Sequence, residues 1–165
     1  MTGSEKTIYT KPIDVLAKVA EFVMVVLMVA MVSLVTYQVF QRYVLEYTPP
    51  WSEELAVYLM IWFGIIGIPV GVRLNSHMSL HYFADKMPRP VQTVSTVITY
   101  LMMIGYVAVL AYEGAGMVTL TMPQLSPAIG LPVGLVYLSL PVAAVLMGIF
   151  LVEKLVKAMA KGGQG

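Results

Sequence analysis

Four long apolar stretches, separated by short polar or proline-containing segments, dominate the sequence. They cover about residues 22–41, 55–72, 91–122 and 133–152. A helix needs about 20 apolar residues to cross a hydrocarbon core of about 30 Å, and each stretch comes close to that length or exceeds it. The pattern predicts an all-α integral membrane protein with four transmembrane helices.

A fifth apolar pattern is shorter and one-sided. Over residues 78–87, apolar side chains recur at the i, i+3, i+4 and i+7 spacing of one helix face, with Phe83 among them. The segment is too short to cross a bilayer, so it predicts a short amphipathic helix on the membrane surface. We expect Arg73, His77 and Phe83 to lie at this membrane interface.

The third stretch is longer than a membrane requires. As one helix, residues 91–122 would reach about 48 Å, which exceeds the hydrocarbon core of about 30 Å. Tilt, projection into water or a break near Gly114 and Gly116 would each reconcile the lengths, and we expect tilt plus projection. The fourth stretch contains Pro141, which predicts a kink.

Basic residues indicate the orientation. Nine of the ten Lys and Arg residues fall on one side of the predicted topology, and only Arg42 falls on the other. Cytoplasmic loops retain positive charge during insertion, so we expect both termini inside the cell. The predicted regions are a cytoplasmic N-terminus with an interfacial lead-in at 1–21, a transmembrane domain at 22–152 and a basic, Gly-rich cytoplasmic tail at 153–165.

The composition argues against a soluble enzyme. Hydrophobic residues make up 59% of the chain and charged residues 12%, whereas soluble domains are about a quarter charged. The chain has no cysteine, so it lacks a thiolate for a nucleophile, a disulfide or a metal site. We predict no catalytic residue, cofactor or metal, and no nucleic-acid partner.

Two polar features leave alternatives open. His77, His81 and Asp85 recur every four residues, which is a metal-ligand spacing on a helix, but we favour an exposed polar stripe. Glu113 lies inside the third stretch, where a carboxylate is costly and invites a functional interpretation. We favour tilt that brings Glu113 to the outer headgroups, or a contact with Arg42 or with a partner protein.

Small residues recur at the spacing of close helix contacts. Gly67 and Gly71 lie four apart in the second stretch, and Ala144 and Gly148 lie four apart in the fourth. Helices in lipid associate through such small faces and through shared polar contacts. A carrier would show more polar or interrupted helix near the bilayer midplane, so the pattern favours a scaffold.

Several motifs occur in a characteristic order. They are Gln41-Arg42-Tyr43-Val44, Trp51-Ser52-Glu53-Glu54-Leu55-Ala56-x-Tyr58-Leu59, Val72-Arg73-x-x-x-His77, Ser126-Pro127-Ala128-x-Gly130-Leu131-Pro132 and Tyr137-x-x-x-Pro141. Over about residues 22–152 the chain resembles the DctQ-like small membrane subunit of tripartite ATP-independent periplasmic (TRAP) transporters. The Pro49-Pro50 pair departs from that family's pattern in the outer loop.

The resemblance implies a role in sodium-coupled uptake of an organic anion such as sialic acid or a C4-dicarboxylate. In such systems a soluble periplasmic protein captures the substrate, and a large membrane subunit carries it by an elevator movement. The small subunit would bind the large one as an obligate partner in the bacterial inner membrane and enlarge its static scaffold.

The outer segment carries candidate docking residues. On the resemblance, Arg42, Trp51, Glu53 and Glu54 lie where the periplasmic protein or the large subunit would make contact. An ion pair between Arg42 and either glutamate within the chain is an equally good interpretation. We also expect Ser52 to cap the helix that follows it.

An independent four-span carrier acting as a dimer is the alternative function. Small multidrug exporters of that kind have a membrane-embedded glutamate in the first span, whereas residues 22–41 contain no acidic residue. The sequence therefore favours a subunit of a larger transporter.

Overall fold

The computed structural model describes residues 11–75 and 89–162. Its helices are α1 (Lys11–Val44), α2 (Pro50–Asn75), α4 (Arg89–Thr121), α5 (Gly134–Tyr137) and α6 (Ser139–Gly162). Four helical segments in these ranges are long and apolar enough to cross a membrane, and the same ranges contain no β-strand. The predicted all-α fold with four membrane-spanning helices is confirmed.

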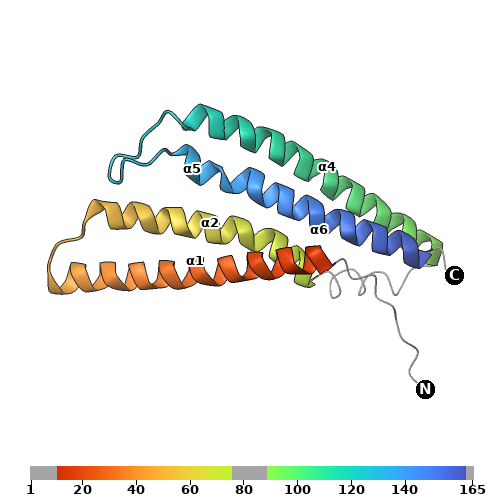
Figure 1. The fold of residues 1–165 in the computed structure, drawn as a ribbon, viewed down its shortest axis with the longest axis horizontal. Helices are drawn as coiled ribbons and strands as arrows, with labels where there is room; N and C mark the ends of the chain where they lie inside the picture. The colour runs from red at the N-terminus through yellow and green to blue at the C-terminus, as the bar shows by residue number, and fades with distance from the viewer. Residues whose placement is uncertain (1–10, 76–88, 163–165) are drawn as a thin grey trace, which may run out of the picture.

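The predicted amphipathic helix at 78–87, with His77 and Phe83, lies outside the described residues, and the N-in, C-in orientation stays a prediction. Figure 1 shows that α1 begins and α6 ends at the same end of the molecule. Following the predicted orientation, we call this the inner end. The outer end is the opposite one, with the turn at 45–49 and the loop at 122–133.

The four long helices lie side by side in one layer. α1 packs on α2, α2 packs on α6, and α6 packs on α4. Figure 1, viewed along the shortest axis of the molecule, shows the helices in this spatial order. The layer therefore consists of two helical hairpins, α1–α2 and α4–α6, which are joined along α2 and α6.

α1 is longer than its apolar stretch. It runs without a break from Lys11 to Val44, with Asp14 in its first turn and Arg42 in its last. These two charges oppose the partial charges of the helix ends and so stabilise both termini. Beyond Val44 the chain turns at Glu46, which has a positive φ of 52°.

The start of α2 differs from the expectation, because Ser52 does not cap it. The helix begins at Pro50, a residue favoured at the first helical position because its missing N–H needs no partner there. Ser52 is buried within the first turn, where its Oγ donates to the Pro49 carbonyl at 2.8 Å. The prediction of a Ser52 cap is wrong, because the proline pair moves the helix start upstream.

The third and fourth stretches behave differently. α4 continues through Gly114 and Gly116 without a break, and a helix of its 33 residues reaches about 50 Å. The fourth stretch is interrupted between α5 and α6, at Leu138. Pro141 lacks an N–H and its ring crowds the carbonyl of Tyr137 one turn earlier, which accounts for the interruption where a kink was predicted.

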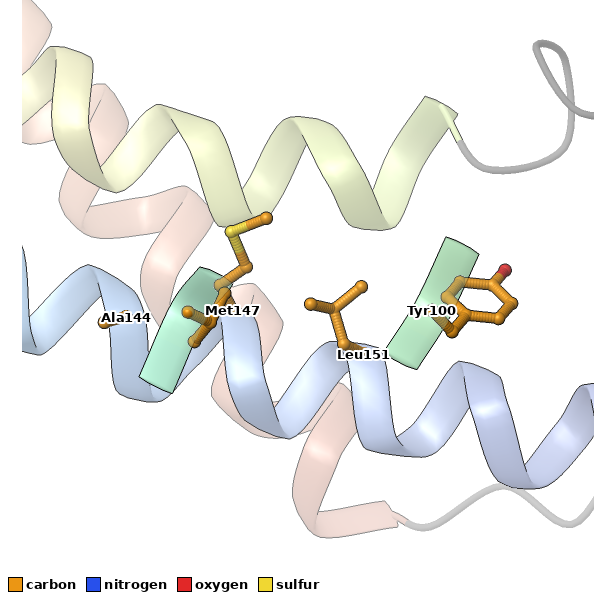
Figure 2. Close-up of a cluster of buried hydrophobic side chains, with 5 residues drawn as sticks. Tyr100, Ala144, Met147 and Leu151 are labelled. Atoms are coloured by element: carbon orange, nitrogen blue, oxygen red, sulfur yellow. The ribbon is translucent and has the colours of Figure 1, made fainter. Parts of the chain in front are cut away.

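The most tightly packed part of the layer lies between α4 and α6. Its buried cluster consists of Tyr100, Val107, Ala144, Met147 and Leu151 (Figure 2). In the most apolar 18 residues of the α5–α6 span, 39% of the residues are buried. In the most apolar 18 residues of α1, 6% are buried. α6 is therefore the central helix of the layer, and α1 is a peripheral helix attached through α2.

Close approach at two glycines fixes the α4–α6 hairpin near the outer end. A Cβ atom on Gly134 would lie 2.9 Å from the backbone nitrogen of Met122, so no side chain fits there without movement. A Cβ atom on Gly114 would lie 3.1 Å from Cβ of Leu140 and 3.2 Å from Cδ of Pro141. Both glycines therefore set how closely the end of α4 approaches α5 and α6.

We expect Gly134→Ala to destabilise the purified chain by roughly 1–3 kcal/mol, because the added methyl group forces the hairpin apart. Gly114→Ala should have a smaller effect of the same sign, since its contacts are less tight. Gly116→Ala is the matched control, because a Cβ atom there meets nothing within 4 Å. Thermal unfolding in detergent, followed by circular dichroism, measures all three variants. Equal melting temperatures for Gly134→Ala and Gly116→Ala would contradict the close approach.

Candidate functional site

At the inner end, the side chain of Arg73 connects three helices. From the last turn of α2, its Nη2 donates to the carboxylate of Asp14 in α1, with which it forms an ion pair. Its Nη1 donates to the carbonyl of Ile13 at 3.3 Å. On the opposite side, its Cζ lies 5.3 Å from the centre of the Phe150 ring of α6, within the range of a cation–π contact.

Lys154 of α6 completes this inner contact. Its Nζ donates to the carbonyl of Val72 and, at 3.3 Å, to the carbonyl of Arg73. Both carbonyls belong to the last turn of α2, where backbone acceptors need partners from outside the helix. The positive charge of Lys154 also opposes the negative end of the α2 dipole. Arg73, predicted as an interfacial residue, thus lies between helices with its side chain 20% exposed.

At the outer end, Glu54 holds the loop between α4 and α5. Its Oε2 accepts hydrogen bonds from the backbone N–H groups of Ala128 and Ile129, at 3.0 and 3.1 Å. A carboxylate that accepts two backbone N–H groups makes charge-assisted bonds, which are stronger than neutral ones. Glu54 therefore joins the Trp-Ser-Glu-Glu motif of α2 to the Ser-Pro-Ala motif of the loop.

The loop itself is folded into a tight hairpin-like turn. Ser126 donates its N–H to the carbonyl of Leu131 at 2.9 Å and accepts the N–H of Gly130 at 3.0 Å. Gly130 has a φ of +73°, a conformation that glycine adopts without steric cost. Pro127 and Ala128 remain exposed at the turn, so the loop offers a defined surface at the outer end.

The other predicted docking residues lie in the exposed part of the outer end. Arg42 and Glu53 are exposed, and Trp51 is 42% exposed with its ring 6.5 Å from that of Tyr37. Within residues 11–75 and 89–162, Arg42 forms no ion pair with Glu53 or Glu54. The ion-pair interpretation is therefore not what this structure shows, and contact with a partner stays a prediction.

Polar side chains also connect neighbouring helices, one pair near the outer end and one about halfway along α2. Gln38 of α1 donates to the carbonyl of Ser52 in α2 at 2.6 Å. Trp62 of α2 donates through Nε1 to the carbonyl of Leu135 in α5 at 3.1 Å. These bonds join the α1–α2 hairpin internally and then join it to the α4–α6 hairpin.

The predicted small-residue faces have different surroundings. A Cβ atom on Gly67 would lie 3.6 Å from Sδ of Met24, and one on Gly148 would lie 3.7 Å from Val107. Ala144 is buried in the α4–α6 cluster. Among the described residues nothing lies within 4 Å of a Cβ atom placed on Gly71, so its packing role stays a prediction.

The sequence did not predict two of the contacts that hold the layer together. The tightest glycine contacts are those of Gly114 and Gly134, yet the pattern of Gly114 and Gly116 indicated only a possible break. The internal role of Glu54 was also missed, because its partners are backbone groups far along the chain. Among the described residues no group of three His, Cys, Asp or Glu side chains is placed to hold a metal; the candidate metal stripe, at 77–85, lies outside them.

We expect Arg73→Met to destabilise the chain by about 1–2 kcal/mol, because Asp14 and the Ile13 carbonyl lose their hydrogen-bond donor. The cost is limited because both groups are partly exposed to solvent. Amide hydrogen exchange should quicken over residues 13–20, since α1 loses its inner contact. Lys18→Met removes an exposed cation of the same helix and is the matched control. An Arg73→Met variant with unchanged exchange in α1 would show that apolar packing alone holds that helix.

We expect Glu54→Ala to raise the hydrogen-exchange rates of the Ala128 and Ile129 amides by at least about tenfold, because each loses a charge-assisted bond of about 1.5–3 kcal/mol. Glu53→Ala, at the adjacent exposed position, is the control and should leave both rates unchanged. Mass spectrometry with fragmentation resolves these amides. Equal rates in the two variants would mean that the loop holds its conformation without Glu54.

Comparison with known proteins agrees with these motifs. Residues 31–161 match the family described as tripartite ATP-independent periplasmic transporters, DctQ component. The chain is similar to the sialic acid TRAP transporter small permease protein SiaQ of Vibrio cholerae, with 30% identity over 104 residues, which cover 61% of this chain and 60% of that protein.

Two longer relatives contain a similar region. The isethionate TRAP transporter permease protein DctMQ of Oleidesulfovibrio alaskensis is 30% identical over 129 residues, which cover 73% of this chain and 20% of that protein. The sialic acid TRAP transporter permease protein SiaT of Haemophilus influenzae is 27% identical over 112 residues, which cover 67% of this chain and 18% of that protein. The matched region thus spans less than two thirds of the V. cholerae protein and about a fifth of the other two.

The family match extends over most of the chain and includes three of its four spans in full or nearly so. Proteins of this family are transporter components, so the prediction that the chain is not an enzyme is confirmed. With four membrane-spanning helices and permease relatives, it is a multi-pass protein of the bacterial inner membrane. The chain belongs to the DctQ family of tripartite ATP-independent periplasmic transporter components.

Proposed function

We propose that this chain is the small scaffold subunit of a sodium-coupled TRAP transporter for an organic anion. In this role it binds a large membrane subunit permanently and does not itself carry the substrate. The single observation that carries the proposal is the arrangement of its helices in one layer. A layer one helix thick encloses no path between helices, but it presents wide faces against which another membrane protein can pack.

The placement of ionisable residues supports a static role. Across residues 22–41, 55–72, 91–122 and 133–152, Glu113 is the only Asp, Glu, Lys, Arg or His. Carriers place ionisable groups or broken helices at the bilayer midplane to bind ions and substrates. The cations and acids of this chain instead gather at the helix ends, where Arg73, Lys154 and Glu54 stabilise the layer.

The relatives support a larger membrane partner. In the proteins named DctMQ and SiaT, the region similar to this chain is about a fifth of a permease polypeptide. In those proteins this region is covalently linked to the rest of the permease. The two parts therefore work side by side. The same association, between separate chains, gives this protein a large membrane subunit as its obligate partner.

The relatives also limit the substrate class. Their names include sialic acid and isethionate, and both compounds are small organic anions. The proposed transporter therefore carries an anion of this kind, with the substrate and sodium sites in the large subunit. The small subunit influences uptake by holding the stationary part of the complex in place while the moving part slides against it.

The outer end is suited to contact with a periplasmic substrate-binding protein. Arg42, Trp51 and Glu53 are exposed there, and Glu54 holds the loop at 122–133 at the same end. Exposed ion pairs are worth about 0–1 kcal/mol each, so such a surface would favour rapid, reversible docking. This is what a protein that repeatedly delivers substrate requires.

Reconstitution into liposomes tests the proposed function. With an inward sodium gradient and a loaded binding protein, we expect labelled sialic acid or isethionate to enter vesicles that contain both membrane subunits. Vesicles with this chain alone should show no uptake, because it has no substrate path of its own. Vesicles with the large subunit alone should lose most of the uptake, because its scaffold lacks support.

The controls separate the parts of the proposal. Sodium-driven uptake by this chain alone would overturn the scaffold role and favour an independent carrier. In the complete system, an Arg42→Ala, Glu53→Ala double variant should raise the concentration of binding protein needed for half-maximal uptake while keeping the maximal rate. Full uptake by the large subunit alone would show that the small subunit is dispensable for transport.

A further inference from the structure

We propose that Glu113 is a polar contact, inside the bilayer, through which α4 binds a cationic side chain on a membrane helix of the large subunit. The inference rests on the proposed function and adds to it the face of the layer and the kind of partner residue involved. It follows from the depth of Glu113, from its exposure, and from the lack of a matching cation in this chain.

The depth of Glu113 follows from the register between α4 and α6. Its neighbour Gly114 lies directly against Leu140 and Pro141, with contacts of 3.1 and 3.2 Å from a Cβ atom placed there. Pro141 lies inside the apolar span Gly134–Val156, and Glu113 itself lies inside the span Val97–Thr121. Both are about two turns, or about 10 Å, from the outer ends of their spans. Glu113 is therefore at hydrocarbon depth.

The direction of the helix keeps the carboxylate at that depth. α4 begins near the inner end and ends near the outer one. Side chains on an α-helix lean toward its N-terminus, so the Glu113 side chain leans away from the outer headgroups. The sequence favours a tilt that brings Glu113 to those headgroups, or a contact with Arg42 or with a partner protein. Of these, the register agrees best with a partner protein.

The carboxylate of Glu113 has no partner among the described residues of the layer. Glu113 is exposed, and no residue in the described parts of the chain gives it a hydrogen bond or an ion pair. An acidic group exposed to lipid tails costs several kcal/mol unless it is hydrogen-bonded. A partner that supplies a hydrogen-bond donor removes most of this cost, so the exposed carboxylate favours association on this face.

The surface around Glu113 leaves room for a second helix. Gly116, one turn further along α4, has open space where a side chain would be. Tyr106, two turns earlier in α4, and Tyr112, which directly precedes Glu113, are 64% and 79% exposed. Their rings would pack against a neighbouring protein, and their hydroxyl groups would hydrogen-bond to polar partners. Close backbone approach at a glycine beside a polar residue is how membrane helices commonly associate.

A second copy of this chain does not fit the same face. Residues 22–41, 55–72, 91–122 and 133–152 contain no Lys, Arg or His, so another copy has no cation at this depth. In a two-fold symmetric dimer through α4, each Glu113 would meet the same surface of its partner, and two like charges would repel each other. Lipid tails carry no cation either. The large subunit is the membrane partner that can supply one.

Co-purification in mild detergent tests the contact. We expect Glu113→Leu to reduce the amount of large subunit recovered with the tagged chain by roughly tenfold, which corresponds to the loss of one strong interhelical contact. Glu113→Gln should lose less, because an amide still accepts a hydrogen bond. The isolated variants should melt at or above the temperature of the unaltered chain, because no described residue pairs with Glu113 and its replacement removes the cost of a charge exposed to apolar surroundings. Unchanged recovery in both variants would overturn the inference.

Photo-cross-linking identifies directly which molecule contacts α4 around Glu113. A photoreactive phenylalanine in place of Tyr112 preserves an aromatic ring and leaves Glu113 in position. We expect covalent adducts with the large subunit, and a strongly reduced yield when the same probe is combined with Glu113→Leu. Adducts only with a second copy of this chain, or only with lipid, would overturn the inference.

The outcomes distinguish this inference from the proposed function. If the unaltered chain fails to recover a large subunit at all, the proposed function fails and the inference falls with it. If the unaltered chain recovers the large subunit but the Glu113 variants do so equally well, only the inference is overturned.

Discussion

The contact of Arg73 with α1 and α6 is the constraint on which the arrangement of this layer depends. In lipid, an apolar side chain gains little by exchanging acyl chains for a neighbouring helix, so polar contacts and close packing decide which helices meet. From α2, the Arg73 guanidinium pairs with Asp14 of α1 and lies over Phe150 of α6. One side chain therefore sets the positions of three helices relative to one another, and Lys154 reinforces it from α6.

Different groups repeat this principle at the outer end and halfway along α2. Glu54 ties the loop to α2, and Trp62 ties α2 to α5. The two hairpins are thus joined by polar contacts toward both ends, while the α4–α6 cluster, with Val72 of α2 packed against it, supplies apolar packing between them. A layer held in this way resists sliding of one hairpin past the other, because sliding would break bonds to groups that have no alternative partner. That resistance is the mechanical property that a scaffold requires.

The sequence predicts the helices well and their arrangement poorly, for physical reasons. Long apolar stretches specify four membrane-spanning helices, and Pro141 marks the interruption before α6. However, α1 and α2 are apolar on nearly every side, so no hydrophobic face indicates which neighbour each one packs against. Arg73 was expected at the interface and Glu54 in docking, yet both bind groups far along the chain, at Asp14 and at Ala128. Spacing along a sequence does not encode such long-range pairs.

Arg73 and Glu113 show why a layer of this kind is suited to be a subunit rather than a complete transporter. Arg73 lies at a helix end, where its carboxylate partner is supplied by the same chain. Glu113 lies inside its span, about two turns from the outer end, and receives no partner from any described residue. A protein that functioned alone in lipid would gain stability by replacing such a carboxylate with an apolar residue. A carboxylate without a partner at this depth is instead consistent with a second protein that completes the contact, and the proposed interaction lies on the α4 face.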